Sequence, residues 1–174
     1  MARKENGEWE AEGPKPKADT SPATFIKVFM SQAILGFFGP FRYLSNFELV
    51  NVVYDGEIYR STEHAYMAAK SLDLEVRKLI QDAPTPRDAK KLGMKIQLRE
   101  DWEEIKFDLM RDVLIQKFTQ EPYRTKLLST GDAYLEETNT WGDVIWGVCN
   151  GVGQNNLGKT IMEIRSWLNE YEAI

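Results

Sequence analysis

The chain has 174 residues, of which 43% are hydrophobic and 28% charged, and its formal net charge is −5. At this length roughly two-thirds of the surface of the unfolded chain becomes buried, which suits one globular domain with a substantial core. The acidic balance argues against tight, non-specific binding to a phosphate backbone, which normally requires a clear basic excess.

Membrane and secretory classes are also disfavoured. No apolar run approaches the ~18–20 residues that a membrane span requires. The N-terminal stretch MARKENGEWEAEG lacks the apolar segment of a secretory signal. Cys149 is the single cysteine, so no disulfide can form within the chain. We therefore expect a cytoplasmic protein without a membrane partner.

The first half of the chain is expected to begin with a flexible arm. Residues 1–23 are rich in charge and proline and poor in apolar side chains, so we expect the arm there and a single domain over residues 24–174. TFIKVF (24–29) is compatible with a strand or the start of a helix. FGPFRYLSNF (38–47) is typical of an ordered loop. NVVYDGEIYRS (51–61) predicts a β-hairpin, because apolar alternation flanks Asp55-Gly56.

Helices are expected to dominate the second half, giving an α+β fold that is predominantly α-helical. Thr85-Pro86 predicts a helix start, and Asp101-Trp102-Glu103-Glu104 resembles a capping box. The expected helices cover about 62–72, LEVRKLIQ (74–81), the segment after Thr85, 102–118, 123–128, and LGKTIMEIRSWLNEY, which Asn156 can cap. Short strands are expected at AYLEET (133–138) and DVIWGVC (143–149).

The stretch STEHAYMAAK (61–70) places Glu63 and Lys70 on one face of a helix, because residues seven apart differ by about 20° after two turns. Ser61 or Thr62 is expected to cap this helix. One interpretation is a shared ligand site over a thin, alanine-rich surface. The other is structural, since an acid at the N-terminus and a base at the C-terminus both complement the helix dipole.

Several kinds of site are excluded or weakly indicated. One histidine and one cysteine cannot make a typical zinc site. GVGQNNLGK (151–159) precedes a helix and could cradle a phosphate, but it matches neither the P-loop nor the dinucleotide motif, and its glycines also suit a tight turn. A basic cluster could hold phosphates, although a solvated helix face explains it equally: Lys90, Lys91, Lys95 and Arg99.

Tryptophans and carboxylates near the C-terminus are further candidates. Trp102, Trp141 and Trp146 neighbour acids or glycines, so they suit either the core or a flat wall for a base or sugar. Glu137 and Asp143 lie in and beside the expected strands. A partly buried carboxylate there would have a raised pKa and could act as an acid or base.

Together these segments resemble the YbiA-like proteins of the NADAR superfamily. The resemblance covers about residues 34–168 and rests on ordered motifs: GFFGPFRYLSNF, STEHAYMAAK, REDWEEIKFDLMRDVLIQKF, LLSTGDAYLEE and DVIWGVCNGVGQNNLGKTIMEIR. Ala65, Met67 and Ala69 depart from the bulkier or amide side chains that are often seen in the EH…K helix, which bears on substrate choice.

The resemblance implies hydrolysis of an N-glycosidic bond, in phosphoribosylamino-pyrimidine intermediates of riboflavin synthesis or in ADP-ribosylated guanine, including guanine of nucleic acid. We expect no cofactor and no metal. Glu63, Lys70 and Asp143 are the expected catalytic residues, with Lys70 as phosphate clamp or as Schiff-base nucleophile. The expected substrate-binding residues are Asn46, Phe47, His64, Trp102, Glu137, Trp146, Gly147 and Asn156.

The rival hypothesis is a module that binds ADP-ribose or a nucleotide without cleaving it, because a fold does not guarantee turnover. The presence of Glu63, Lys70 and Asp143 together favours the enzyme, because a binding module does not need all three ionisable groups. Product formation from the candidate substrates separates the two hypotheses.

Overall fold

The structure is a computed structural model that describes residues 2–3, 9–10 and 33–172. The chain divides into two units, residues 1–30 and 31–174. In the first unit, β1 (Ala2–Arg3) pairs antiparallel with β2 (Trp9–Glu10). The rest of the expected arm, and the undecided segment 24–29, lie outside the described residues.

The second unit contains short strands and mostly helices, so the predicted α+β, predominantly helical fold is confirmed. Its helices are the 3₁₀-helix η1 (Gly39–Leu44), α2 (Thr62–Ala68), α3 (Leu74–Gln81), α4 (Pro86–Gly93), α5 (Trp102–Phe118), α6 (Tyr123–Leu128) and α7 (Asn156–Glu172). Its strands are β3 (Ile34–Leu35), β4 (Val52–Tyr54), β5 (Glu57–Tyr59), β6 (Leu135–Glu136), β7 (Thr138–Asn139) and β8 (Val148–Cys149).

The described strands of the second unit form three separate pairs. β4 and β5 make the predicted hairpin, and Asp55 and Gly56 both take positive φ, as its two-residue turn requires. The other two pairs, β3 with β6 and β7 with β8, are parallel, and the first of them joins segments about one hundred residues apart in sequence. Long-range pairs of two residues leave almost no local signal, so the sequence did not predict them.

The helix starts follow their capping residues. The Ser61 hydroxyl accepts the N–H of His64, and the Thr85 hydroxyl accepts that of Asp88 ahead of Pro86. The α2 helix ends at Ala68, earlier than the expected residue 72. The chain turns there because the Asp73 carboxylate already accepts two N–H groups of α3, which fixes the start of that helix.

Three other expectations are corrected. The capping box at Asp101 is not formed, because the Asp101 carboxylate pairs with the Arg99 guanidinium at 2.6 Å. Of the strand expected over 143–149, only Val148–Cys149 is extended. The remainder is a turn around Asp143. The loop expected over 38–47 contains η1.

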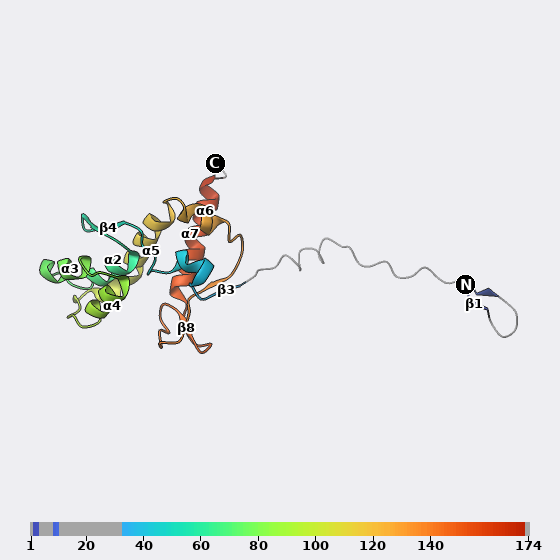
Figure 1. Cartoon of the computed structure of the whole chain (residues 1–174), viewed down its shortest axis with the longest axis horizontal. Helices are drawn as coiled ribbons and strands as arrows, with labels where there is room; N and C mark the ends of the chain where they lie inside the picture. Colours follow the sequence, from blue (N-terminus) through green and yellow to red (C-terminus); the bar gives the residue numbers. More distant parts are fainter. Residues whose placement is uncertain (1, 4–8, 11–32, 173–174) are drawn as a thin grey trace. The chain divides into compact units, whose positions relative to one another are not determined.

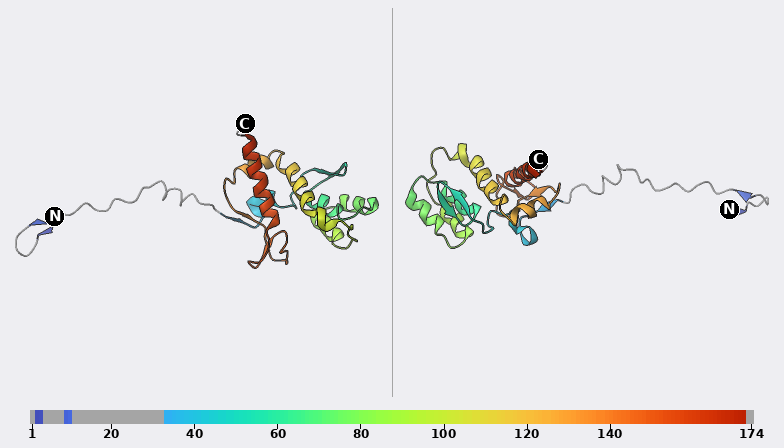
Figure 2. Two further views of the ribbon diagram at one scale, coloured as in Figure 1. Left: turned by 180° about the vertical axis from the view of Figure 1, so that it is seen from behind. Right: turned by 90° about the horizontal axis from the view of Figure 1, so that it is seen from above.

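The core surrounds α5. In Figures 1 and 2, α2, α3 and α4 lie on one side of α5, and α6 and α7 lie on the other. Every residue of α2 is buried, so this short helix runs through the interior rather than over the surface. Its alanines allow α4 and α5 to approach closely. None of the helices in the described residues is long and apolar enough to cross a membrane.

Candidate functional site

The first turn of α2 is held by the LSNF motif (residues 44–47). The Glu63 N–H donates to the Asn46 carbonyl at 3.2 Å, and the Thr62 hydroxyl donates to the Asn46 side-chain oxygen at 2.9 Å. Asn46 is buried and also contacts the sulfur of Met110 on α5. These contacts fix where the Glu63 side chain leaves the helix, so Asn46 acts on the candidate site by positioning Glu63.

The Glu63 carboxyl is buried without a hydrogen-bond partner on one oxygen. Glu63 is 5% exposed, and its Oε1 has no partner among the described residues. Burial raises its pKa to about 7, while the charges of Lys90 and Lys70 oppose this rise and that of Asp143 adds to it. A carboxyl that titrates near neutral pH suits an acid or base.

This buried carboxyl has a stability consequence that can be measured. The folded-state pKa of about 7 lies above the model value of 4.5, so the folded protein binds more protons and its stability falls as pH rises between these values. We expect Glu63→Gln to raise the free energy of unfolding above pH 7 by on the order of 3 kcal/mol, and to change it little below pH 4.

Urea unfolding at several pH values checks this expectation. Glu75→Gln is the matched control, because Glu75 occupies the corresponding first-turn position of α3 but is exposed to solvent. Equal effects of the two substitutions at every pH would contradict a desolvated Glu63.

Glu137 is a second carboxyl in the same region, on a half-buried residue. It lies between β6 and β7, and its Oε2 is buried without a hydrogen-bond partner among the described residues. Burial raises its pKa to about 7, and the charges of Asp143 and Glu63 raise it further, against those of Lys90 and Lys117. Glu63 is therefore near enough for its charge to affect Glu137.

Lys70 lies beside an aromatic wall. Its Nζ is 5.7 Å from the ring centroid of Tyr66 and 5.8 Å from that of Trp102, and its hydrogen bond to the Gly93 carbonyl is long, at 3.5 Å. Burial lowers the pKa of Lys70, the Glu63 charge raises it, and the Lys90 charge lowers it. Lys70 and Glu63 thus act on each other. The predicted shared helical face is not formed, because α2 ends at Ala68 and Lys70 lies in the turn that follows.

The aromatic wall itself is built around Tyr66. Trp102 packs against the Tyr66 ring at 5.0 Å, and Trp146 meets it edge-on at 5.5 Å and donates its indole N–H to the Tyr66 hydroxyl at 3.1 Å. Trp102 is 5% exposed. Trp146 is half-buried, so it is the better placed of the two tryptophans to meet a ligand.

Asp143 begins the segment DVIWG (residues 143–147) and holds the turn that this segment forms. Its Oδ1 accepts the N–H groups of Ile145 and Trp146, at 3.1 and 2.9 Å. Asn139 holds the same turn, because its amide oxygen accepts the Asp143 N–H and its amide nitrogen donates to the Asp143 carbonyl. Asp143 therefore has a structural role, and its charge also raises the pKa of Glu63 and Glu137.

Gly147 permits its segment to approach Glu137 and Asn139 closely. A Cβ at residue 147 would lie 2.3 Å from the Glu137 carbonyl oxygen and 2.7 Å from the Asn139 amide nitrogen. We expect Gly147→Ala to lower the free energy of unfolding by ~2 kcal/mol or more, because backbone and a buried amide must move. Urea unfolding measures this loss.

The control for that substitution is Gly151→Ala. Gly151 has a φ of 77° but open space around its Cβ position, so only backbone strain of about 1 kcal/mol is expected. A smaller loss for Gly147→Ala than for this control would contradict the close approach.

His64, which sequence analysis placed among the substrate-binding residues, lies in the core. Its side chain is fully buried, with Nδ1 2.7 Å from the Ser61 hydroxyl and Nε2 3.1 Å from the Ala83 carbonyl. Burial lowers its pKa. Both ring nitrogens are occupied, which favours a structural role that anchors α2.

The glycine-rich segment before α7 serves the turn rather than a free phosphate site. The N–H groups of residues 154, 155, 156 and 157 donate to carbonyls of residues 144, 147, 145 and 146. Asn156 also donates its side-chain amide to the Ile145 carbonyl at 2.8 Å. This use of the backbone donors favours the interpretation of the glycines as turn residues.

Lys90, on α4, lies at the site, although the sequence indicated only a basic cluster. Its Nζ is 5.7 Å from the ring centroids of both Phe47 and Trp141. Its charge acts on Glu63, Glu137 and Lys70. Phe47 comes from the LSNF motif and Trp141 from the Asp143 turn. Lys90, Phe47 and Trp141 therefore come from three segments that are distant in sequence, and no local pattern of residues predicts that these segments meet.

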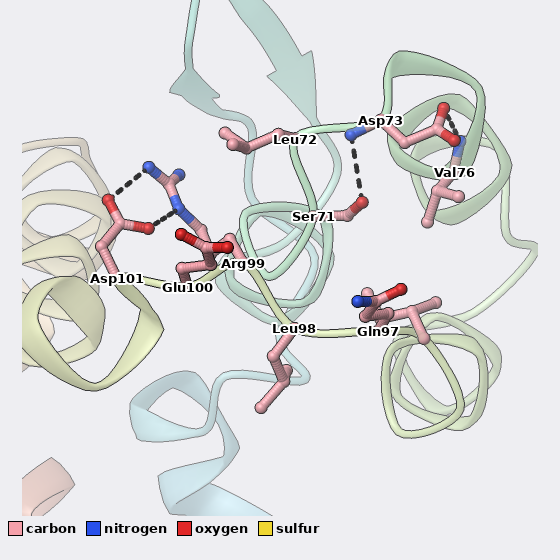
Figure 3. A pocket seen from close by; sticks show the side chains of 10 residues that line it. Ser71, Leu72, Asp73, Val76, Gln97, Leu98, Arg99, Glu100 and Asp101 are labelled. Atoms are coloured by element: carbon pink, nitrogen blue, oxygen red, sulfur yellow. Dashed lines mark hydrogen bonds and ion pairs between the residues drawn. The ribbon is translucent and has the colours of Figure 1, made fainter.

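An open cleft of roughly 700 Å³ lies between α3 and the segment that follows α4. Figure 3 shows its wall, where the Ser71 hydroxyl accepts the N–H of Asp73 and the Arg99 guanidinium pairs with Asp101. It contains none of Glu63, Glu137 and Asp143, so it is not the candidate site. The described residues contain no group of three His, Cys, Asp or Glu that could hold a metal ion.

Comparison with known proteins identifies the family. A sequence model described as the NADAR domain matches residues 28–169, which is most of the chain. The chain belongs to the NADAR domain family. The resemblance noted in the sequence is thereby confirmed.

Similar proteins include several with functional names and one with a solved structure. A protein named N-glycosidase Npun_R5314 from Nostoc punctiforme is 38% identical over 72% of this chain and 85% of its own. N-glycosidase YbiA of Escherichia coli K12 is 34% identical over 82% and 93%. Riboflavin biosynthesis protein VVA0006 of Vibrio vulnificus is 33% identical over 74% of this chain and 36% of its own. The NMR structure of E. coli YbiA matches with a TM-score of 0.73 at 32% identity, over 83% of this chain and 89% of that one.

Proposed function

We propose that this NADAR domain hydrolyses the N-glycosidic bond between a phosphorylated ribose and a base or amine. The relatives named N-glycosidase confirm the predicted enzyme class. The substrate is the finer part of the proposal. Phosphoribosylamino-pyrimidines and ADP-ribosylated guanine are the two candidates, and the relative named as a riboflavin biosynthesis protein supports testing the first.

One observation carries the proposal. Glu63 and Glu137 each have a buried carboxyl oxygen without a hydrogen-bond partner among the described residues. The Glu63 charge acts on Glu137 and on the Lys70 amine. Leaving a buried polar atom unpaired costs stability, so such atoms are expected where a ligand completes the bonds. Cleavage of C1′–N develops positive charge on the ribose, which a carboxylate stabilises.

We assign Lys70 as the nucleophile, since burial favours its neutral amine. Its nitrogen attacks C1′, and the bond from C1′ to the base nitrogen breaks. The electron pair leaves on that nitrogen, which takes a proton from a protonated carboxyl. The ribose ring of the lysine adduct then opens to a protonated Schiff base as the bond from C1′ to O4′ breaks, and O4′ takes the proton that the lysine nitrogen loses. Water adds to C1′ of this Schiff base, the bond from C1′ to the lysine nitrogen breaks to regenerate the amine and leave the sugar aldehyde, and the released proton passes to the carboxylate.

Of the acids, Glu63 is the first candidate for the proton transfers. Asp143, the second candidate from sequence, has one oxygen committed to the turn. The unpaired oxygen of Glu137 makes this residue a third candidate for the same role, beyond substrate binding.

A parallel hydrolysis assay tests the proposal. The purified protein is incubated with free nucleotides, a phosphoribosylamino-pyrimidine and ADP-ribosylated guanine in DNA, and products are resolved by mass spectrometry. We expect release of the free base or amine from one phosphorylated substrate. Binding of these compounds without any product would favour the rival binding module.

A further inference from the structure

The Lys90 ammonium lies at the candidate site without a counter-ion. Lys90 forms no ion pair and no hydrogen bond within the part of the chain that the structure describes, and its contacts are the ring faces of Phe47 and Trp141. Other lysines of this region do have polar partners. Lys91 on the same helix pairs with Asp88 at 3.7 Å, and Lys117 donates to the Ser45 carbonyl at 2.7 Å.

Ring faces stabilise an ammonium without using its hydrogen bonds. Cation–π contacts are electrostatic, so the three N–H donors of Lys90 stay open to an anion. Trp141 is 61% exposed, which leaves solvent access beside the ammonium. The site therefore offers an approachable positive charge between two aromatic rings.

The nearby acids do not fill this role. Lys90 lowers the pKa of Glu63 but forms no ion pair with it, and Glu63 titrates near pH 7, so it is often neutral. Lys90 also lowers the pKa of Lys70, which means that two cations face the same region. Like charges so placed are unfavourable until an anion binds between or beside them.

We infer that Lys90, flanked by Phe47 and Trp141, binds the phosphate on the 5′ carbon of the ribosyl substrate. The inference deepens the proposed function and rests on it for the position of C1′ near Glu63 and Lys70. Lys90 then acts as the phosphate clamp, which leaves Lys70 to react. The domain selects 5′-phosphorylated ribosides over free nucleosides, whether the phosphate is a monoester or part of a diphosphate.

Isothermal titration calorimetry with non-hydrolysable probes tests the subsite without requiring turnover. Wild-type protein is titrated with ribose, ribose 5-phosphate and ADP-ribose. We expect at least one phosphorylated probe to bind about tenfold more tightly than ribose. Lys90→Met should remove this preference, Lys90→Arg should retain most of it, and Lys91→Met should leave it unchanged.

The pattern of binding also separates the two sources of phosphate. A Lys90-dependent preference for ribose 5-phosphate indicates a monoester, and one confined to ADP-ribose indicates a diphosphate. The inference is overturned if neither probe binds more tightly than ribose, or if folded Lys90→Met or Lys90→Gln keeps the preference. Lys90-dependent binding in a protein that cleaves no candidate substrate would support the subsite and refute the hydrolase.

Discussion

Lys70→Arg is expected to abolish turnover as completely as Lys70→Ala. A nucleophilic lysine acts through a neutral amine, which a guanidinium cannot supply at accessible pH. Burial beside Tyr66 and Trp102 lowers the Lys70 pKa and favours that neutral form. Borohydride added during turnover should trap a covalent sugar adduct on Lys70 of the wild-type protein, which peptide mass spectrometry would locate.

The alternative role of Lys70 makes opposite predictions. A phosphate clamp acts through charge, so Lys70→Arg would keep much of kcat and mainly change KM. Lys91→Arg is the control for a general effect of the exchange, because Lys91 is exposed on α4. An active Lys70→Arg protein that gives no trapped adduct would assign Lys70 as the clamp and remove it as nucleophile.

Glu63→Gln is expected to reduce kcat by ~100-fold or more. Glutamine preserves the size and hydrogen-bonding capacity of the side chain, but it can neither carry the charge that stabilises an oxocarbenium-like state nor exchange a proton. The loss should appear in a protein that remains folded, since the substitution removes a buried ionisable group whose pKa burial raises to about 7.

Rates and folding are compared in the same preparation, by initial-rate kinetics and circular dichroism. Glu75→Gln, the exposed counterpart on α3, should keep wild-type kcat. Glu137→Gln tests whether the second unpaired carboxyl shares the proton transfers. Near-normal turnover of folded Glu63→Gln would exclude Glu63 from the mechanism.

Much of the local structure could be predicted from the sequence, because the interactions concerned are local. Asp55-Gly56 indicates the hairpin turn through its positive φ angles, and Ser61 and Thr85 mark helix starts through hydrogen bonds within one turn. Helix spacing predicted that Glu63 and Lys70 lie close together, and their charges do interact, although α2 ends at Ala68 and Lys70 lies in the turn that follows it.

The environment of the single histidine was not predictable in this way. His64 neighbours Glu63 in sequence, yet its ring lies in the core against the Ala83 carbonyl, nineteen residues away. Adjacent residues of a helix point in different directions, so one meets the site and the other meets the packing between helices. Only the position of neighbouring elements decides which direction is solvated.

The ordered motifs of the sequence carried the resemblance to the family. Spacing within short segments predicted most of the helices, the hairpin and the closeness of Glu63 to Lys70. The tertiary structure decided that Glu63, Glu137 and Lys90, from three separate segments, lie close enough for their charges to interact, and that Asp143 holds a turn. The physical reason is that burial and charge coupling depend on through-space distance. Long-range packing sets those distances, and no local pattern of residues records them.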